Sequence, residues 1–256
     1  SYHLLFGVAG LLSFGHALYF AVGAYGLGIV LRDTQLALVP AMGVVLLGAV
    51  VLAAALGALS LRVTGIAFAM VTLAFAQAGS VLVRRNAAIT NGEEGLPLEV
   101  ANIPTELVGV INTRNLYWIA LGMLVVVFLI VTWFERSRAG HVVVAAREND
   151  LRVRVLGMTP FTVRLITVVL AGSLAALVGM VYLLLQSGVT PAVTTPDFTL
   201  TLLVIVVLGG VGSRWGAVVG GLIYTLLDQR LTALSRSEAI ADLPDVLRIP
   251  LSEPLF

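Results

Sequence analysis

The sequence predicts an all-α polytopic membrane protein, a helix bundle in which two of the helices are discontinuous. Of its 256 residues, 59% are apolar and only 11% are charged, whereas soluble domains carry roughly 25% charged residues. Five uncharged runs are each long enough for the roughly 20 residues that cross a bilayer: 1–31, 34–61, 63–83, 115–134 and 165–196. Five such runs indicate a membrane bundle rather than the buried core of a soluble domain. We expect one transmembrane domain, 1–256.

The composition excludes several kinds of chemistry. The chain has no cysteine, so disulfides and thiolate metal sites are excluded. Every basic residue is arginine, so the chain has neither a Schiff-base lysine nor a phosphate-loop lysine. His3 and His141 have no ligand-spaced partner, so we predict no metal site. The first residue is Ser1 rather than Met, and we expect helices to be missing at one or both ends.

The first discontinuous helix lies in the run 1–31. Leu4–Leu12 and His16–Leu31 have the composition of apolar helices, and Ser13, Phe14 and Gly15 separate them. A helix break at membrane depth is tolerated where it packs inside protein or lines a watery path. Ser13 is predicted to cap the second half. The break is therefore a candidate transport pathway; the alternative is a glycine-rich packing helix.

A second break follows the apolar run Leu200–Leu208, at Gly209–Ser213. Gly15 aligns with Gly212, and another glycine follows each of them after eight residues. Four full crossings separate the two broken helices, which predicts an inverted repeat if each broken helix crosses once. Paired interrupted helices indicate the binding site of a transporter. Two re-entrant hairpins with the same orientation and a chance similarity of glycine-rich helices are the alternatives.

Under the repeat hypothesis, two half-helix N-termini meet near the midplane, at Gly15–His16 and Gly212–Ser213. Their partial positive charge would favour a carboxylate. His16 could bridge two helices or contact the substrate. Gln77 is costly in lipid and should face protein or a cavity. Four aromatic neighbours would tolerate an aliphatic side chain: Phe14, Tyr19, Phe20 and Phe75.

Two polar segments connect the crossings. Residues 84–116 form the longest polar loop, and 135–164 contain six arginines, which places the second segment in the cytoplasm. Helical spacing predicts one helix over 142–156, with the i,i+4 pairs Glu148–Arg152 and Asp150–Arg154. Gly157 would end this helix, and Thr159 and Pro160 would begin the next. The helix is either a solvated surface helix or a docking helix for a cytoplasmic partner.

Five stretches together resemble one family, the permease subunits of branched-chain amino acid ABC importers. They are Leu12-Ser13-Phe14-Gly15-His16-Ala17, Thr72-Leu73-Ala74-Phe75-Ala76-Gln77, Thr90-Asn91-Gly92-Glu93-Glu94-Gly95-Leu96, Arg147-Glu148-Asn149-Asp150 with Gly157, and Leu208-Gly209-Gly210-Val211-Gly212-Ser213 with Gly216. The chain looks most like the subunit type whose break contains Ser-Phe-Gly-His. Asn91 departs from the glycine that is usual in the family's loop.

The resemblance implies a non-enzymatic, multi-pass permease of the bacterial inner membrane. It implies two cytoplasmic ATPase subunits that bind the ATP, a second related permease and an extracytoplasmic binding protein; no cofactor is implied for the chain itself. The implied substrates are branched-chain or other apolar amino acids. The alternatives are urea or short amides on the same architecture, and an ion-coupled secondary transporter. An intramembrane hydrolase using Ser213 is disfavoured because no nucleophile elbow surrounds it.

The resemblance and the break pattern together give three sets of expected functional residues. The transport pathway comprises Ser13, Phe14, Gly15, His16, Tyr19, Phe75, Gln77, Gly210, Gly212 and Ser213. The cytoplasmic coupling helix, 142–157, contacts the ATPase through Arg147, Glu148, Asn149, Asp150, Arg152 and Gly157. The extracytoplasmic loop, 84–116, contacts the binding protein through Asn91, Gly92, Glu93 and Glu94.

Overall fold

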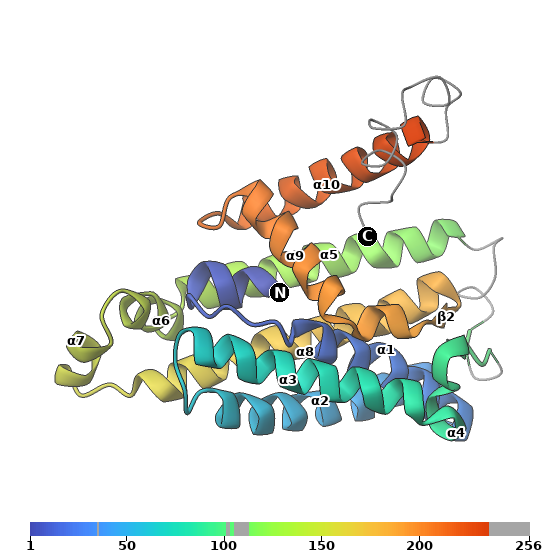
Figure 1. Ribbon diagram of the computed structural model, residues 1–256, viewed down its shortest axis with the longest axis horizontal. Coiled ribbons are helices and arrows are strands. Elements are labelled where there is room, and N and C mark those ends of the chain that lie inside the picture. Colours follow the sequence, from blue (N-terminus) through green and yellow to red (C-terminus); the bar gives the residue numbers. More distant parts are fainter. Residues whose placement is uncertain (35, 101–102, 105–112, 236–256) are drawn as a thin grey trace, which may run out of the picture. The chain divides into compact units, whose positions relative to one another are not determined.

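The computed structural model describes residues 1–34, 36–100, 103–104 and 113–235 (Figure 1). The chain divides into two compact units, Ser1–Leu200 and Thr201–Phe256, and each is described by itself. The sequence predicted one transmembrane domain, 1–256, and this stays a prediction.

The described chain is almost entirely helical, which confirms the predicted fold class. Four helices are long and apolar enough to cross a membrane: α2 (Leu38–Ser60), α3 (Ile66–Arg85), α5 (Thr113–Arg136) and α8 (Pro160–Gln186). They are the four crossings expected between the two broken elements. The remaining long helices are α1 (His16–Asp33), α9 (Pro196–Gly209) and α10 (Arg214–Ser235). Two two-residue strands, β1 (Leu96–Pro97) and β2 (Gly188–Val189), pair antiparallel.

The core of the first unit forms where α1 crosses α8. A Cβ on Gly23 would collide with the backbone of Ala176, and a Cβ on Gly179 would collide with the carbonyl oxygen of Phe20. Glycine at both positions allows the two backbones to touch, as small residues do between membrane helices. Helix α2 packs against the same pair of helices.

Helix α3 buries Phe68 near its start and, after it, a stripe of small and hydroxylated side chains. Gly65 precedes it with φ 62°, a left-handed conformation that glycine adopts without strain. Thr72, Ala76 and Ser80 are buried at helical spacing, whereas Gln77 is exposed. The expectation that Gln77 faces protein or a cavity stays a prediction, since its side chain is exposed and lies outside this buried stripe.

The predicted single helix over 142–156 is wrong, because Asn149 divides it into α6 (Arg138–Glu148) and α7 (Asp150–Val155). The backbone of Asn149 is extended, with φ −154° and ψ 100°, and its side chain accepts a hydrogen bond from the Arg152 amide. An asparagine side chain that binds a nearby backbone amide competes with helix continuation.

The boundaries after α7 are as predicted. Gly157 has φ 77°, and its amide donates to the Arg154 carbonyl while the Met158 amide donates to the Val153 carbonyl. This paired pattern is the Schellman motif, which ends helices at a glycine. Pro160 then occupies the first turn of α8, after Thr159 at the N-cap.

The second broken element bends by 113° between α9 and α10. Gly210 has φ 97°, which glycine tolerates, and Ser213 accepts a hydrogen bond from the Gly216 amide at the start of α10. Helix α9 begins at Pro196, before the predicted apolar run Leu200–Leu208, and α10 continues to Ser235.

Candidate functional site

The first break is longer than the sequence predicted. Only Leu4–Val8 is helical in the first half, as one π-helical turn, η1, and α1 begins at His16. The predicted helix Leu4–Leu12 is therefore wrong in its second part. Gly10 has φ 67°, a left-handed conformation that ends helices.

Threonines from two other helices satisfy the backbone amides of the break. The Phe14 amide donates to Thr72 Oγ1 at 3.1 Å, and the Ala17 amide donates to Thr199 Oγ1 at 3.0 Å. Both threonines are buried. A Cβ on Gly15 would lie 2.8 Å from the Thr72 carbonyl oxygen, so glycine is required for this approach. The break therefore packs inside protein, one of the two conditions under which such breaks survive in membranes.

These contacts revise the predicted capping. The Ser13 hydroxyl accepts from the Gly15 amide at 3.3 Å, so it stabilises the turn before α1 and does not cap the first turn of the helix. That role belongs to Thr199, on α9, which the sequence prediction missed. The available signal was a threonine inside an apolar helix, but nothing in the sequence shows that α9 reaches the start of α1.

His16 forms an internal bridge. Its Nε2 lies 3.0 Å from Ser1 Oγ, and its side chain is 1% exposed. The ring packs edge-on against Tyr2 and Tyr19, at centroid distances of 5.3 Å and 6.3 Å. This geometry favours the bridging role over the substrate-contacting role, because protein groups surround the ring.

The other expected pathway residues divide into two groups. Ser13, Gly15 and Tyr19 are buried together in the first unit, and Phe14 and Phe75 are half-buried there. In the second unit, three exposed residues lie at the second break: Gly210, Gly212 and Ser213. The meeting of the two breaks stays a prediction, since it concerns the placement of one unit against the other.

The arginine-rich segment holds the N-terminal half of the first break. The Arg147 guanidinium donates to the Gly7 carbonyl. A Cβ on Gly10 would lie 2.7 Å from Cγ of Arg147, so the arginine stem fills the space that the glycine leaves. His3 Nε2 lies 3.2 Å from Glu135 Oε1, near the end of α5. One of the residues expected to couple to a cytoplasmic partner, Arg147, therefore touches the break directly.

An apolar cluster reinforces this connection. Side chains from η1 pack with side chains from α5, α6 and α8, and the buried members are Leu4, Leu5, Val8, Ala9, Val131, Phe134, Val143, Val168, Ala171 and Leu174. Since closely packed interiors transmit displacement rather than absorb it, a movement of α6 would reach η1.

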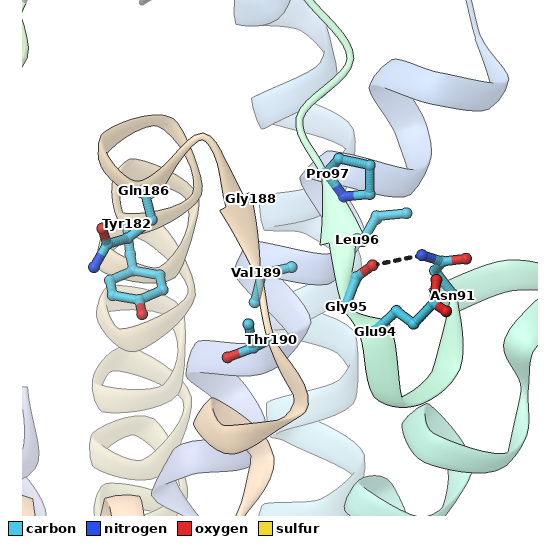
Figure 2. Close-up of a pocket in the computed structure, with 10 residues that line it drawn as sticks. All are labelled: Asn91, Glu94, Gly95, Leu96, Pro97, Tyr182, Gln186, Gly188, Val189 and Thr190. Atoms are coloured by element: carbon cyan, nitrogen blue, oxygen red, sulfur yellow. Dashed lines mark hydrogen bonds between the residues drawn. The ribbon is translucent and has the colours of Figure 1, made fainter. Parts of the chain in front are cut away.

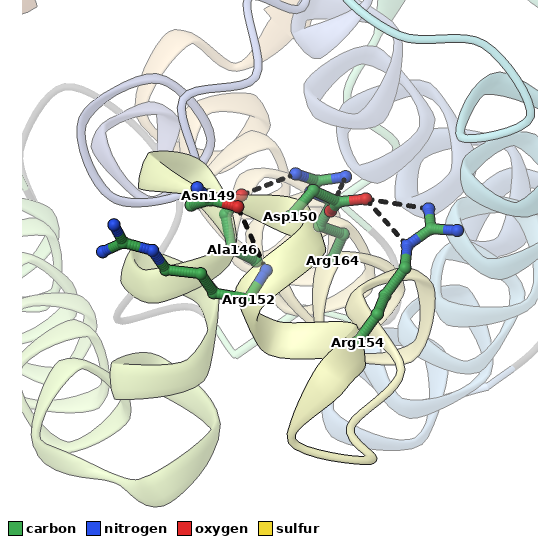
Figure 3. A network of polar contacts seen from close by, with 6 residues as sticks. All are labelled: Ala146, Asn149, Asp150, Arg152, Arg154 and Arg164. Atoms are coloured by element: carbon green, nitrogen blue, oxygen red, sulfur yellow. Dashed lines mark hydrogen bonds and ion pairs between the residues drawn. The ribbon is translucent and has the colours of Figure 1, made fainter.

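Asp150 organises the polar face beside α7 (Figure 3). It pairs with Arg154 at 2.8 Å and with Arg164 at 3.1 Å, and Arg164 also donates to the Ala146 carbonyl at 3.0 Å. The predicted Asp150–Arg154 pair is confirmed. The predicted Glu148–Arg152 pair does not form, because Asn149 interrupts the helix between them. The network fixes α7 on α6 and α8.

Helix α7 exposes large apolar side chains. Leu151, Val155 and Leu156 are 71%, 80% and 71% exposed. They line a shallow cavity of about 500 Å³ together with Asn149 and Arg152. Exposed apolar side chains gathered in one place mark interaction sites. The sequence prediction emphasised charged coupling residues and missed these three, although the i,i+4 spacing of Leu151 and Val155 was visible.

The expected binding-protein loop is folded rather than extended. After α3 come α4 (Ala87–Thr90), the 3₁₀ turn η2 (Gly92–Glu94) and β1. Asn91 has φ 61° and donates through Nδ2 to the Gly95 carbonyl at 2.8 Å. Asparagine is the residue that most readily replaces glycine in this conformation, which explains why it can stand at the family's glycine position.

The four residues expected to contact the binding protein have different environments. Gly92 is buried, so it does not offer a contact surface. Glu93 pairs with Arg84 at 3.6 Å. Asn91 and Glu94 line a cavity of about 520 Å³ beside the two short strands (Figure 2). Asn91 and Glu94 therefore remain candidates for a contact surface, whereas Gly92 is buried and Glu93 is already paired.

Comparison with known proteins gives a consistent family. The family model described as branched-chain amino acid transport system / permease component matches residues 1–248. The high-affinity branched-chain amino acid transport system permease protein LivM of Escherichia coli (strain K12) is 26% identical over 250 residues, which cover 88% of this chain and 58% of that protein. The protein of the same name from Salmonella typhimurium is 26% identical over 253 residues, covering 88% of this chain and 58% of that protein.

A third relative comes from another organism. A probable branched-chain amino acid transport permease protein LivM of Methanocaldococcus jannaschii is 26% identical over 264 residues, covering 89% of this chain and 75% of that protein. The chain thus spans somewhat over half the length of the two bacterial relatives. No solved structure matches it significantly.

Proposed function

Because this chain belongs to the branched-chain amino acid transport system permease family, we propose that it forms the translocation path of an ATP-driven importer. One observation carries the mechanism: Arg147, in the cytoplasmic segment, is bonded to the Gly7 carbonyl in the first half of the broken helix. An ATPase that moves the cytoplasmic segment would thereby move one side of the break. The membrane location of the chain is established by the family and by the four apolar helices.

The first step of the proposed mechanism would be the docking of an ATPase subunit on α7. Its three exposed apolar side chains suit a groove on a cytoplasmic ATPase subunit, and Asp150 holds α7 against α6 and α8 through Arg154 and Arg164. A displacement of α7 would pass to α6, and from α6 to η1 through Val143 and Arg147. The displacement would be transmitted by rigid packing between these helices rather than by a flexible linker.

The second step would occur at the break. With Thr199 on the Ala17 amide and Thr72 on the Phe14 amide, the start of α1 is closed by protein hydroxyls. Moving η1 would loosen these contacts and expose the helix N-terminus, whose partial positive charge suits a carboxylate. The half-buried Phe14 and Phe75 would then border the side chain of the substrate. Closed and open arrangements of the break would thus alternate with the state of the ATPase.

Apolar amino acids are the proposed substrates. The names of the relatives support this class, and so do the half-buried Phe14 and Phe75 beside the start of α1. The proposed partners are a second permease of the same family, two cytoplasmic ATPase subunits and an extracytoplasmic binding protein. The proposed location is the inner membrane of a bacterium. The permease would need no cofactor, since its partners bind the ATP.

Polar substitution of the exposed apolar residues of α7 tests the docking step. We expect the double substitution Leu151→Ser with Val155→Ser to lower co-purification of the ATPase subunits with the full-length permease by at least about tenfold, since each buried aliphatic side chain contributes about 1.5–3 kcal/mol. ATP-driven uptake in proteoliposomes should fall with it. The folded state should persist, because both side chains are exposed in the isolated chain.

The matched control is Val144→Ser on α6, an apolar residue that is also exposed but lies outside α7. We expect this variant to retain the ATPase subunits at the parent level. If the α7 variant retained its ATPase subunits and its uptake equally well, α7 would not be the docking element.

A further inference from the structure

The cavity beside β1 and β2 is negatively charged. Its lining comes from the loop after α3 (Asn91, Glu94, Gly95, Leu96, Pro97), from the end of α8 (Tyr182, Gln186) and from β2 with the next residue (Gly188, Val189, Thr190). Figure 2 shows the loop residues and the α8 residues on either side of the strand pair. Among these lining residues Glu94 is the charged one, so the cavity carries a net negative charge.

Glu94 is available to a partner. Its neighbour Glu93 is paired with Arg84, and the described part of the chain places no arginine against Glu94. Asn91, the neighbouring polar side chain of the lining, is an uncharged amide whose Nδ2 donates to the Gly95 carbonyl, so it does not neutralise the carboxylate. Both Asn91 and Glu94 are exposed. The carboxylate is therefore left without an ionic partner on an accessible wall.

The backbone around the cavity adds to the negative potential. Tyr182 and Gln186 lie in the last turns of the 27-residue helix α8, whose C-terminus carries a partial negative charge. Tyr182 lines the same cavity, and aromatic rings attract cations. A carboxylate, a helix C-terminus and an aromatic ring all favour an ammonium or a guanidinium group.

The same groups disfavour a free amino acid. A zwitterion brings a carboxylate as well as an ammonium, and the described lining offers no cation to receive it. The two helix starts in the lining, at Asn91 and Thr190, begin 3₁₀ turns of three and four residues, which are too short for a substantial dipole. A basic side chain presented by a protein has no such second charge. We infer that this cavity is a socket for an arginine or lysine side chain of the extracytoplasmic binding protein, an inference that rests on the proposed function.

The position of the cavity agrees with this partner. It lies at the end of α8 opposite to α7, and a helix of that length spans about 40 Å; Figure 1 shows α7 and β2 at opposite ends of α8. Since the arginine-rich segment marks the cytoplasmic side, the cavity faces the other side. The two-stranded sheet of β1 and β2 also holds the wall of the cavity in place, because Leu96 and Val189 pair across it and are both buried.

The test uses the assembled transporter in nanodiscs, with ATPase activity measured against the concentration of the purified cognate binding protein. We expect Glu94→Gln to raise the half-saturating concentration about tenfold, as truncating one partner of a close charge pair does, without changing the basal or maximal activity. Glu99→Gln, which changes an exposed carboxylate on the same loop outside the cavity lining, should stay within about twofold of the parent. Added salt should weaken the parent's response more steeply than that of Glu94→Gln.

Charge reversal then identifies the source of the cation. Glu94→Arg should abolish stimulation, and a binding protein in which one basic residue of the docking face is replaced by glutamate should restore it. A half-saturating concentration equal to the parent's for Glu94→Gln would overturn the socket and leave the proposed function standing. A changed dependence on substrate, with an unchanged dependence on binding protein, would also overturn it. A parent complex that does not respond to binding protein at all would overturn both proposals.

Discussion

Replacing Arg147 by alanine should lower substrate uptake at least about tenfold while leaving ATP hydrolysis running. The guanidinium donates to the Gly7 carbonyl, and the arginine stem fills the space beside Gly10. Removing the side chain leaves the carbonyl without a charged donor and opens a gap between α6 and η1, a loss of about 1.5–3 kcal/mol for a hydrogen bond to a charged group. The ATPase would then move the cytoplasmic segment without moving the break.

The decisive readout for Arg147 is the ratio of ATP hydrolysed to substrate moved, because a merely destabilised protein would lose both together. We expect that ratio to rise about as much as uptake falls. Arg138→Ala on the same helix is the matched control, since its side chain is exposed at the start of α6. Gly10→Ala should reproduce the defect, because its Cβ would lie 2.7 Å from Cγ of Arg147 at a φ of 67°. Uptake near the parent level in Arg147→Ala, with an unchanged ratio, would refute this connection.

Replacing Gly179 by alanine should strongly destabilise the folded permease, although it adds only one methyl group. Its Cβ would meet the carbonyl oxygen of Phe20 and lie 3.1 Å from the Ala24 amide nitrogen. Those neighbours are backbone atoms inside α1, so they cannot rotate away. The helices must separate, and we expect a loss of about 3 kcal/mol, the upper end for overpacked cores. Thermal unfolding of the purified protein in detergent measures it.

Gly48→Ala is the matched control for this substitution. Gly48 lies inside α2 and is exposed, and a Cβ there would meet nothing within 4 Å. Alanine should therefore leave stability unchanged or raise it by about 0.5–1 kcal/mol, as in an unobstructed helix. Equal melting temperatures for the two variants would show that the α1–α8 crossing is looser than the structure has it.

The sequence was sufficient for the four crossings and for the helix boundaries that carry strong local signals. Long uncharged runs leave few alternatives in a bilayer, and strong local signals set the ends: Gly157 after α7, Pro160 at the start of α8, Gly65 before α3. The failures came where a local signal competed with helical periodicity. Asn149 looks acceptable inside a charged helix, and only its own hydrogen bond to the Arg152 amide shows that it divides the segment.

The site was less predictable because its parts are distant in the sequence. Thr199 reaches the Ala17 amide across 182 positions, and Arg147 reaches the Gly7 carbonyl across 140. Neither contact produces a periodic pattern in the sequence. Asn91 is a different case: its left-handed backbone could be inferred once the family's glycine was known. Gln77 shows the limit of hydropathy, since its cost in lipid predicts a protein neighbour but does not identify one.

In the proposed mechanism, this chain moves an amino acid because ATPases act on its cytoplasmic segment. The most direct measurement is uptake of radiolabelled leucine into proteoliposomes that contain the full-length permease, its second permease and both ATPase subunits, with the binding protein on the opposite side. We predict uptake that requires ATP on the side of α7 and is unaffected by collapsing proton and sodium gradients. Uptake that an ion gradient drives in the absence of ATP would contradict this mechanism.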